Sequence, residues 1–87
     1  MDDTIRLVAR ELSIYLDEHP DAVDTADGIQ RWWLSSRRIE ATLEDVGQAL
    51  DLLIAQGVAE RRRMPDGRSV YGRALSRGGY RAAVALH

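Results

Sequence analysis

The sequence predicts a small α+β domain, mainly helical, in which three helices are followed by a two-stranded hairpin and a C-terminal helix. Three observations lead to this fold class. Apolar residues recur with helical spacing in three segments before Gly57, and strand-like residues flank a turn signal at 65–67. The chain has 87 residues without repeats or a linker, so one modest core and a single domain over residues 1–87 are expected.

The first predicted helix begins at the acidic N-terminus and ends before Pro20. Asp2, Asp3 and Thr4 offer carboxylates and a hydroxyl to the free amides of its first turn. A residue that precedes a proline is pushed away from helical geometry, so Pro20 marks the end of the helix. Its buried face is predicted from apolar residues three and four positions apart, namely Ile5, Val8, Leu12, Tyr15 and Leu16.

A second, shorter helix is expected before residue 39. Ala22 and Val23 favour a very short extended segment, after which Asp24 or Thr25 can cap the helix. The run 35–38, Ser-Ser-Arg-Arg, fits either a continuation of this helix or a turn. The apolar cluster of the helix consists of Ile29, Trp32, Trp33 and Leu34.

The third helix has signals at both ends. Thr42 and Asp45 have the spacing of a capping box, with aspartate in place of the usual glutamate. Gly57 stands where a left-handed cap residue is expected. One face of the helix is apolar and is predicted to be buried: Leu43, Val46, Ala49, Leu50, Leu53 and Ile54.

A hairpin and a last helix complete the prediction. Val58 begins a strand, Pro65-Asp66-Gly67 is a turn signal, and 69–71 begins the returning strand. Ser76 can cap a helix over 76–86, although Gly78 and Gly79 weaken its first turn. The apolar residues of that helix are Tyr80, Ala83, Val84 and Leu86.

Composition excludes several classes of function. The chain has no cysteine, so disulfides and thiolate metal sites are excluded. No apolar run approaches the roughly 18–20 residues that span a bilayer, and the N-terminus is acidic where a secretory signal is basic, so we expect a cytoplasmic protein without a membrane partner. His19 and His87 lack partners at ligand spacing, and no nucleophile motif or phosphate-binding loop is present. We therefore expect no enzyme, metal, cofactor or small-molecule substrate.

Charge is divided unevenly along the chain. Residues 1–56 contain five arginines and twelve carboxylates, a net charge of −7, whereas residues 57–87 contain seven arginines and two carboxylates, a net charge of +5. Such asymmetry indicates a basic contact surface or head-to-tail self-association. It also allows a protein partner or a homodimer. The alternative is two solvated faces that differ in charge and meet no partner.

The run Gln56-Gly57-Val58-Ala59-Glu60-Arg61-Arg62, followed by Asp66-Gly67-Arg68 and Tyr71, resembles the passage from recognition helix to wing in winged helix-turn-helix proteins. The run 75–80, Leu-Ser-Arg-Gly-Gly-Tyr, resembles the pattern that often follows the wing in that superfamily. The resemblance implies a winged-helix fold and a small DNA-binding module of the bacterial regulator type, with a regulatory role in transcription. It also implies that the third helix enters the major groove while the wing contacts the backbone or the minor groove.

The basic hairpin carries most of the candidate contacts to DNA. Side chains alternate along a strand, so Arg61 and Arg63 are expected on one face and Arg62 on the other. The alternative is that these arginines are solvated or pair with Glu60 and Asp66. The candidate nucleic-acid-binding residues are Arg61, Arg62, Arg63, Arg68, Arg37, Arg38 and Gln48.

The third helix and the tryptophan pair suggest a second function, a protein-interaction module that binds no DNA. The outward face of the third helix is acidic, and carboxylates repel a polyanion. Adjacent helical positions differ by about 100°, so one tryptophan is expected in the core and the other partly exposed, either towards a partner or along its own domain. The candidate partner interface consists of Trp32, Trp33, Glu44, Asp45 and Asp51.

Overall fold

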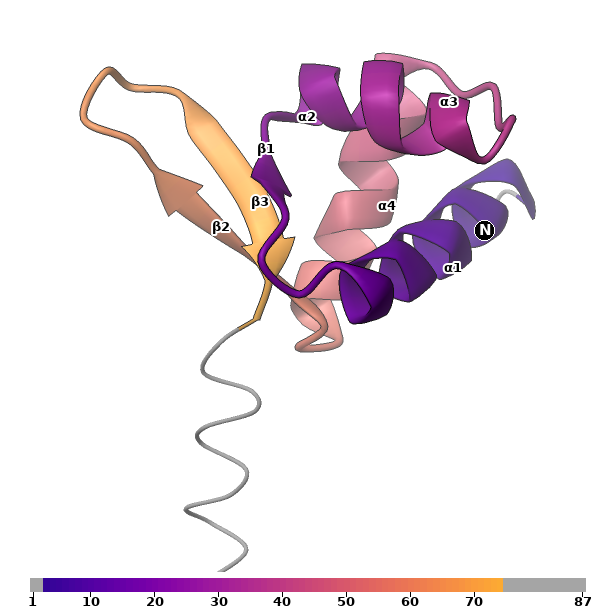
Figure 1. The fold of residues 1–87 in the computed structure, drawn as a ribbon, viewed down its shortest axis with the longest axis horizontal. Coiled ribbons are helices and arrows are strands. Elements are labelled where there is room, and N and C mark those ends of the chain that lie inside the picture. The colour runs from indigo at the N-terminus through magenta and orange to yellow at the C-terminus, as the bar shows by residue number, and fades with distance from the viewer. Residues whose placement is uncertain (1–2, 75–87) are drawn as a thin grey trace, which may run out of the picture.

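The computed structural model describes residues 3–74 and has an α+β architecture that is mainly helical. Helices occupy one side and a hairpin extends from the other (Figure 1). Segments α2, η1 and α3 follow one another without a break and form the second predicted helix. The elements are α1 (Asp3–Glu18), β1 (Val23–Asp24), α2 (Ala26–Gly28), the π-helical η1 (Ile29–Trp33), α3 (Leu34–Ser36), α4 (Leu43–Ala55), β2 (Ala59–Arg63) and β3 (Ser69–Arg73).

Helix α1 confirms the first prediction in its bounds and in its buried face. It ends at Glu18, two residues before Pro20. Tyr15 is half-buried and stacks on Trp33, with ring centroids 4.5 Å apart and planes at 16°. This stacking fixes the second helix against the first. The residues of α1 in the core are Ile5, Val8, Ala9, Leu12 and Leu16.

The second helix contains a wide turn and buries one tryptophan of the pair. Thr25 caps its start, because the Thr25 hydroxyl accepts the backbone N–H of Gly28 at 3.1 Å. The Leu34 N–H donates to the Ile29 carbonyl, five residues back, as in a π-helix. Trp33 lies in the core with 6% of its surface exposed, while Trp32 points outward with 67% exposed.

Helix α4 has the predicted signals at both ends. The Asp45 N–H donates to the Thr42 hydroxyl at 3.0 Å, and the Thr42 N–H donates back to the Asp45 carboxylate at 3.2 Å, which confirms the capping box. Gly57 has φ 76°, and the Val58 N–H reaches the Leu53 carbonyl at 2.9 Å, so the helix ends in a Schellman motif.

The predicted apolar face of α4 is correct in its centre and wrong at its first residue. Leu43 is 47% exposed, because it lies in the first turn of α4, beyond the end of the core on which the apolar face packs. Ile54 and Leu52 are half-buried and pack against the core from its edge. The fully buried residues of α4 are Val46, Ala49, Leu50 and Leu53.

Within residues 3–74 the sheet has three antiparallel strands in the order β1-β3-β2. The very short extended segment expected near Val23 is present as β1, and it joins the predicted two-stranded hairpin as a third strand. The hairpin itself is confirmed: Arg63 pairs with Ser69, and the turn between them closes with Gly67 at φ 91°. Strand β1 pairs with the other edge of β3, where Gly72 leaves room for the close approach of the two strands. A Cβ on Gly72 would lie 3.0 Å from the Ala22 carbonyl oxygen and 3.1 Å from the Val23 side chain.

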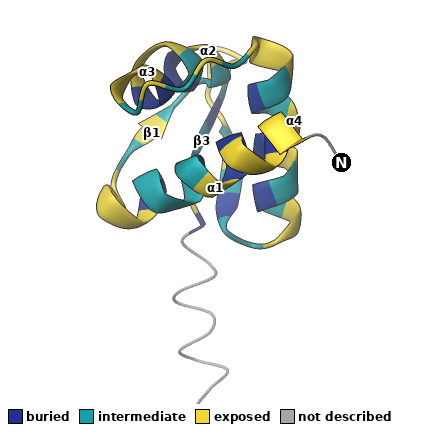
Figure 2. Ribbon diagram, turned by 90° about the vertical axis from the view of Figure 1, so that its right-hand side faces the viewer, coloured by how far each residue is buried: buried dark blue, intermediate teal, exposed yellow. Residues whose placement is uncertain are grey.

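One core joins these elements. Buried residues line the facing sides of α1, α4 and the second helix, and exposed residues lie on their outer sides (Figure 2). None of the helices within residues 3–74 is long and apolar enough to cross a membrane. The predicted last helix over 76–86 lies outside the described residues.

Candidate nucleic-acid interface

The hairpin formed by β2 and β3 projects beyond the helices (Figure 1). Ala59 lies opposite Arg73 and Arg63 lies opposite Ser69 in the antiparallel ladder. Because side chains alternate along a strand, the odd-numbered residues of β2 share one face of the ribbon. Ala59 is buried at the base of this face, and Arg61 and Arg63 continue it into solvent. The predicted alternation of the arginines therefore follows from the register and burial of the strand.

Two of the four candidate arginines in the hairpin are neutralised by their own neighbours. Arg62 lies 3.0 Å from the carboxylate of Glu60, two residues away on the same face of β2. In the turn, Arg68 lies 2.8 Å from Asp66. The Arg68–Asp66 pair is largely exposed and the Arg62–Glu60 pair is partly buried, so both hold the side chains in place more than they stabilise the fold.

Asp66 is held in its charged form by the turn. Its carboxylate accepts the backbone N–H of Arg68 at 3.0 Å, which lowers the pKa of Asp66 from its ordinary value, and the Arg68 guanidinium acts in the same direction. Asp66 therefore remains available as the partner of Arg68 under all but acidic conditions.

Arg61 and Arg63 differ from their neighbours, because neither forms an ion pair or a side-chain hydrogen bond with another residue of the described chain. Both are exposed. Two residues on a strand are about 6.6 Å apart, so the two guanidinium groups can reach separate phosphates on the same side of the ribbon. We call Arg61 and Arg63 the free arginine pair.

The structure does not bring Arg37 and Arg38 to the hairpin. They follow α3, which lies at the opposite end of the molecule from the hairpin (Figure 1). Arg37 is half-buried and lies 2.9 Å from Glu11 and 3.6 Å from Glu18. Its role in this structure is to tie the end of α3 to α1.

Arg38 has an unusual backbone. Its φ of 59° falls in the left-handed region, at the position after the helix where glycine is usually found. The N–H groups of Arg38 and Ile39 bond to the carbonyls of Ser35 and Leu34 at 3.0 and 2.9 Å, so the turn itself is well satisfied. The strain therefore comes from the arginine Cβ, not from missing hydrogen bonds.

Replacing Arg38 with glycine is expected to raise the free energy of unfolding by about 0.5–1 kcal/mol, because glycine adopts this conformation without a steric penalty. Urea denaturation of the two proteins measures the difference. Replacing Arg38 with alanine keeps the Cβ and is the matched control. If glycine stabilises no more than alanine, the strain is absent.

The outward face of α4 is acidic, as predicted. Gln48 is exposed and lies between Glu44 and Asp51, which are also exposed. Asp45 is half-buried, and its carboxylate accepts the Thr42 N–H in the capping box, so it contributes charge but not a free carboxylate. Gln48 is therefore the one candidate base contact on a surface that repels phosphate.

The two tryptophans separate clearly. Trp32 presents most of its indole to solvent, whereas Trp33 is buried and stacked on Tyr15. Trp33 was placed in the candidate partner interface, and this assignment is wrong because its ring fills the core. Of the pair, Trp32 alone can meet a partner.

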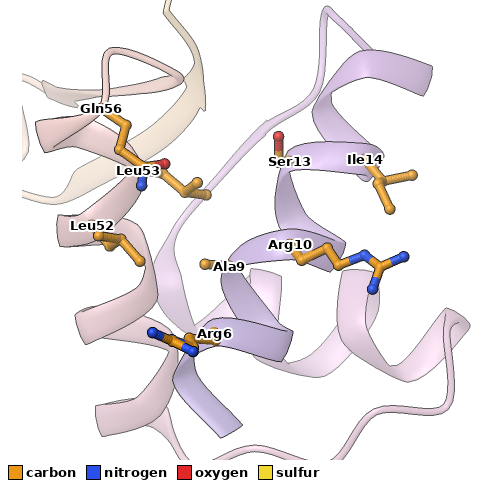
Figure 3. A pocket seen from close by; sticks show the side chains of 8 residues that line it. All are labelled: Arg6, Ala9, Arg10, Ser13, Ile14, Leu52, Leu53 and Gln56. Carbon is orange, nitrogen blue, oxygen red and sulfur yellow. The ribbon is translucent and has the colours of Figure 1, made fainter. Parts of the chain in front are cut away.

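Sequence reasoning missed a groove of about 540 Å³ between α1 and α4. Figure 3 shows Arg6 pointing towards α4, with Arg10 and Ile14 pointing away from it. The spacing within each helix could not reveal the groove, because it depends on how the two helices lie against each other. The lining residues are Arg6, Ala9, Arg10, Ser13, Ile14, Leu52, Leu53 and Gln56.

A second hollow, of about 770 Å³, lies beside the loop that precedes α4 and includes Gln30, Arg38 and Glu40 in its lining. The Gln30 side chain already donates to the Ala41 carbonyl at 2.8 Å, so this polar group holds the loop. Over residues 3–74 no three His, Cys, Asp or Glu side chains gather closely enough to hold a metal ion. His19 instead packs against Tyr15, with ring centroids 4.5 Å apart.

Comparison with known proteins gives no relative from which a function could be inferred. No family model matches the chain, no curated protein matches its sequence and no solved structure matches its fold.

Proposed function

We propose that this chain is a winged-helix module that binds DNA through backbone contacts of its hairpin and acts in the regulation of transcription. The order of elements supports a winged helix: three helical segments precede the hairpin, and β1 adds to the outer edge of β3. In such an arrangement the hairpin is the wing, and α4 is the helix that faces DNA.

The free arginine pair is the observation that carries this proposal. Arg62 and Arg68 already have carboxylate partners, whereas Arg61 and Arg63 are exposed cations on one face of a projecting strand. Two unpaired guanidinium groups at this spacing suit neighbouring phosphates, which accept hydrogen bonds from arginine in a bidentate manner. The hairpin can therefore bind a nucleic-acid backbone without first breaking internal ion pairs.

The acidic face of α4 limits the kind of binding that we expect. Glu44 and Asp51 would approach phosphates if α4 entered the major groove deeply, and Gln48 offers the one conventional base contact between them. Contacts to the backbone would then dominate. We expect a dissociation constant of about 10⁻⁴ to 10⁻⁶ M at physiological salt, the range of sequence-independent binding.

Fluorescence anisotropy of a labelled random-sequence duplex tests the proposal. Titrations at low and at moderate salt should both show binding, with affinity falling as salt rises because bound counterions are released. A chain that binds no duplex at low salt would contradict the proposal, since even a sequence-independent binder gives a signal there.

A second candidate is a protein-interaction module, and the exposure of Trp32 favours it. A side chain of this size at 67% exposure is typical of an interface anchor. Winged helices can also bind proteins in place of DNA, because a fold does not determine its ligand. Absence of duplex binding at low salt would favour this candidate over the first.

A further inference from the structure

The outer face of α1 carries a stripe that no other described element covers. Positions opposite the buried face recur every three or four residues along the helix. Leu7 is 47% exposed and Ile14 is half-exposed, and charged residues flank both. We call this set, Arg6, Leu7, Arg10, Ile14 and Asp17, the α1 stripe.

Charge along the stripe is divided between its two ends. Arg6 and Arg10 lie in the first half of α1, and neither forms an ion pair with another described residue. Asp17 lies in the last turn, where no basic residue accompanies it. Asp3 stands in the first turn, so the first half of the helix carries two arginines against one carboxylate, and the last turn presents a carboxylate.

Asp17 is placed where a carboxylate is unfavourable. The C-terminal end of a helix carries partial negative charge, which repels acidic side chains. Its neighbour Glu18 is compensated by Arg37, 3.6 Å away, but Asp17 has no cation within the described part of the chain. A partner that brings positive charge to Asp17 would compensate this unfavourable position.

We propose that α1 pairs in an antiparallel manner with α1 of a second copy of this chain. A twofold axis across the helix sets the basic half of each copy against the acidic end of the other. In this pairing Asp17 of the second copy lies between Arg6 and Arg10, which are about one helical turn apart. The stripe is thus self-complementary, as a twofold interface requires.

The groove beside the stripe supplies the apolar part of the contact. Ala9 and Leu53 are buried and form part of its floor, and Ile14 stands at its edge (Figure 3). Ile14 of the second copy, beside the aliphatic stem of Arg6 that points towards α4, can cover this floor. Charge complementarity sets the direction of the helices, and the apolar floor provides the area removed from water.

The interface is small, so the dimer should be weak. One helix from each copy falls at the lower end of the range of interface sizes, and we expect a dissociation constant of about 10⁻⁵ to 10⁻⁶ M. Dimerisation is measured without nucleic acid, so its outcome is independent of whether the hairpin binds DNA.

Sedimentation equilibrium of the whole chain between about 1 and about 100 µM tests the pairing. The wild-type protein should show a reversible monomer–dimer equilibrium. D17R should shift it at least tenfold towards monomer, because two ion-pair sites per dimer become repulsive. D51R makes the same change of charge on the outer face of α4 and should leave the equilibrium unchanged.

Compensating changes make the test specific. The double variant R10E/D17R sets a carboxylate at position 10 of each copy against a cation at position 17 of the other, so dimerisation should return in part, while Arg6 remains close to the new cation. Loss of fold does not account for the effect of D17R, since a cation in the last turn of a helix is locally favourable and the melting temperature should not fall.

Three outcomes would each overturn the pairing. The wild-type chain could remain monomeric over the whole concentration range. D17R could dimerise as well as wild type, which would place the interface elsewhere. R10E/D17R could remain monomeric while D17R alone loses the dimer, which would mean that Asp17 does not face Arg10 of the second copy.

Discussion

Replacing Trp33 with alanine is expected to lower the free energy of unfolding by about 3–5 kcal/mol, whereas the same replacement at Trp32 should change it by no more than about 0.5 kcal/mol. The two residues are adjacent and identical, so composition and helix propensity change equally in both variants. The difference arises from burial, because Trp33 is 6% exposed and Trp32 is 67% exposed. Trp33→Ala also removes the ring that stacks on Tyr15.

Urea denaturation followed by far-ultraviolet circular dichroism measures both changes. For a domain of this size total stability is about 4–13 kcal/mol, so Trp33→Ala can leave the chain largely unfolded. Trp33→Phe keeps an aromatic ring and should lose less stability, which retains a measurable transition. Equal losses at Trp32 and Trp33 would show that the indole of Trp32 is packed against its own domain.

The tryptophan pair also shows where sequence reasoning stopped. Helical geometry predicted that one ring would be buried and the other exposed, but not which. The choice depends on which face of the second helix packs against α1, where Trp33 stacks on Tyr15. The same helix also contains a π-helical turn, in which the Leu34 N–H bonds to the Ile29 carbonyl. That wide turn shifts the angular position of each following residue, and a period of 3.6 residues does not contain it.

Elements specified by nearby residues were predicted well. The capping box needs only Thr42 and Asp45, and the end of α4 needs only a glycine at position 57, so both could be read from the sequence. Pairing of β1 with β3 could not, because a strand of two residues has no periodicity of its own. It forms because β3 offers a free edge and Gly72 permits the close approach.

The candidate site also contains features that nearby residues specify and features that depend on tertiary packing. Pairing of Arg62 with Glu60 and of Arg68 with Asp66 was one of the two interpretations that the sequence allowed, since each pair is two residues apart. The ion pair between Arg37 and Glu11 joins residues 26 positions apart, so sequence spacing could not predict it. It depends on the packing of α3 on α1, and it holds Arg37 away from the candidate interface. The groove beside α1 depended on tertiary structure for the same reason.

Replacing both Arg61 and Arg63 with alanine is expected to weaken duplex binding about 60-fold at about 0.1 M salt. Each neutralised phosphate contributes about −0.9 to the slope of log affinity against log salt, so two contacts contribute about −1.8. The slope should therefore become shallower by about two units, and the affinities of wild type and variant should approach each other as salt rises.

The variant R62A/R68A is the matched control, because it removes two arginines from the same hairpin and changes the net charge equally. Arg62 and Arg68 are held by Glu60 and Asp66, so they have less freedom to reach phosphate. Long-range attraction between the protein and DNA decreases to the same extent in both variants. A larger reduction of the salt slope in R61A/R63A than in R62A/R68A therefore measures direct contact by the free arginine pair.

Anisotropy titrations at several salt concentrations, with the same labelled duplex for all three proteins, give the slopes. Both variants should keep the wild-type unfolding midpoint, because the replaced side chains are not part of the core. If the two variants share one slope, net charge alone governs binding and the face of β2 that carries Arg61 and Arg63 is not the contact. If neither slope differs from that of wild type, the hairpin does not touch the backbone, and the free arginine pair is only a solvated edge of the sheet.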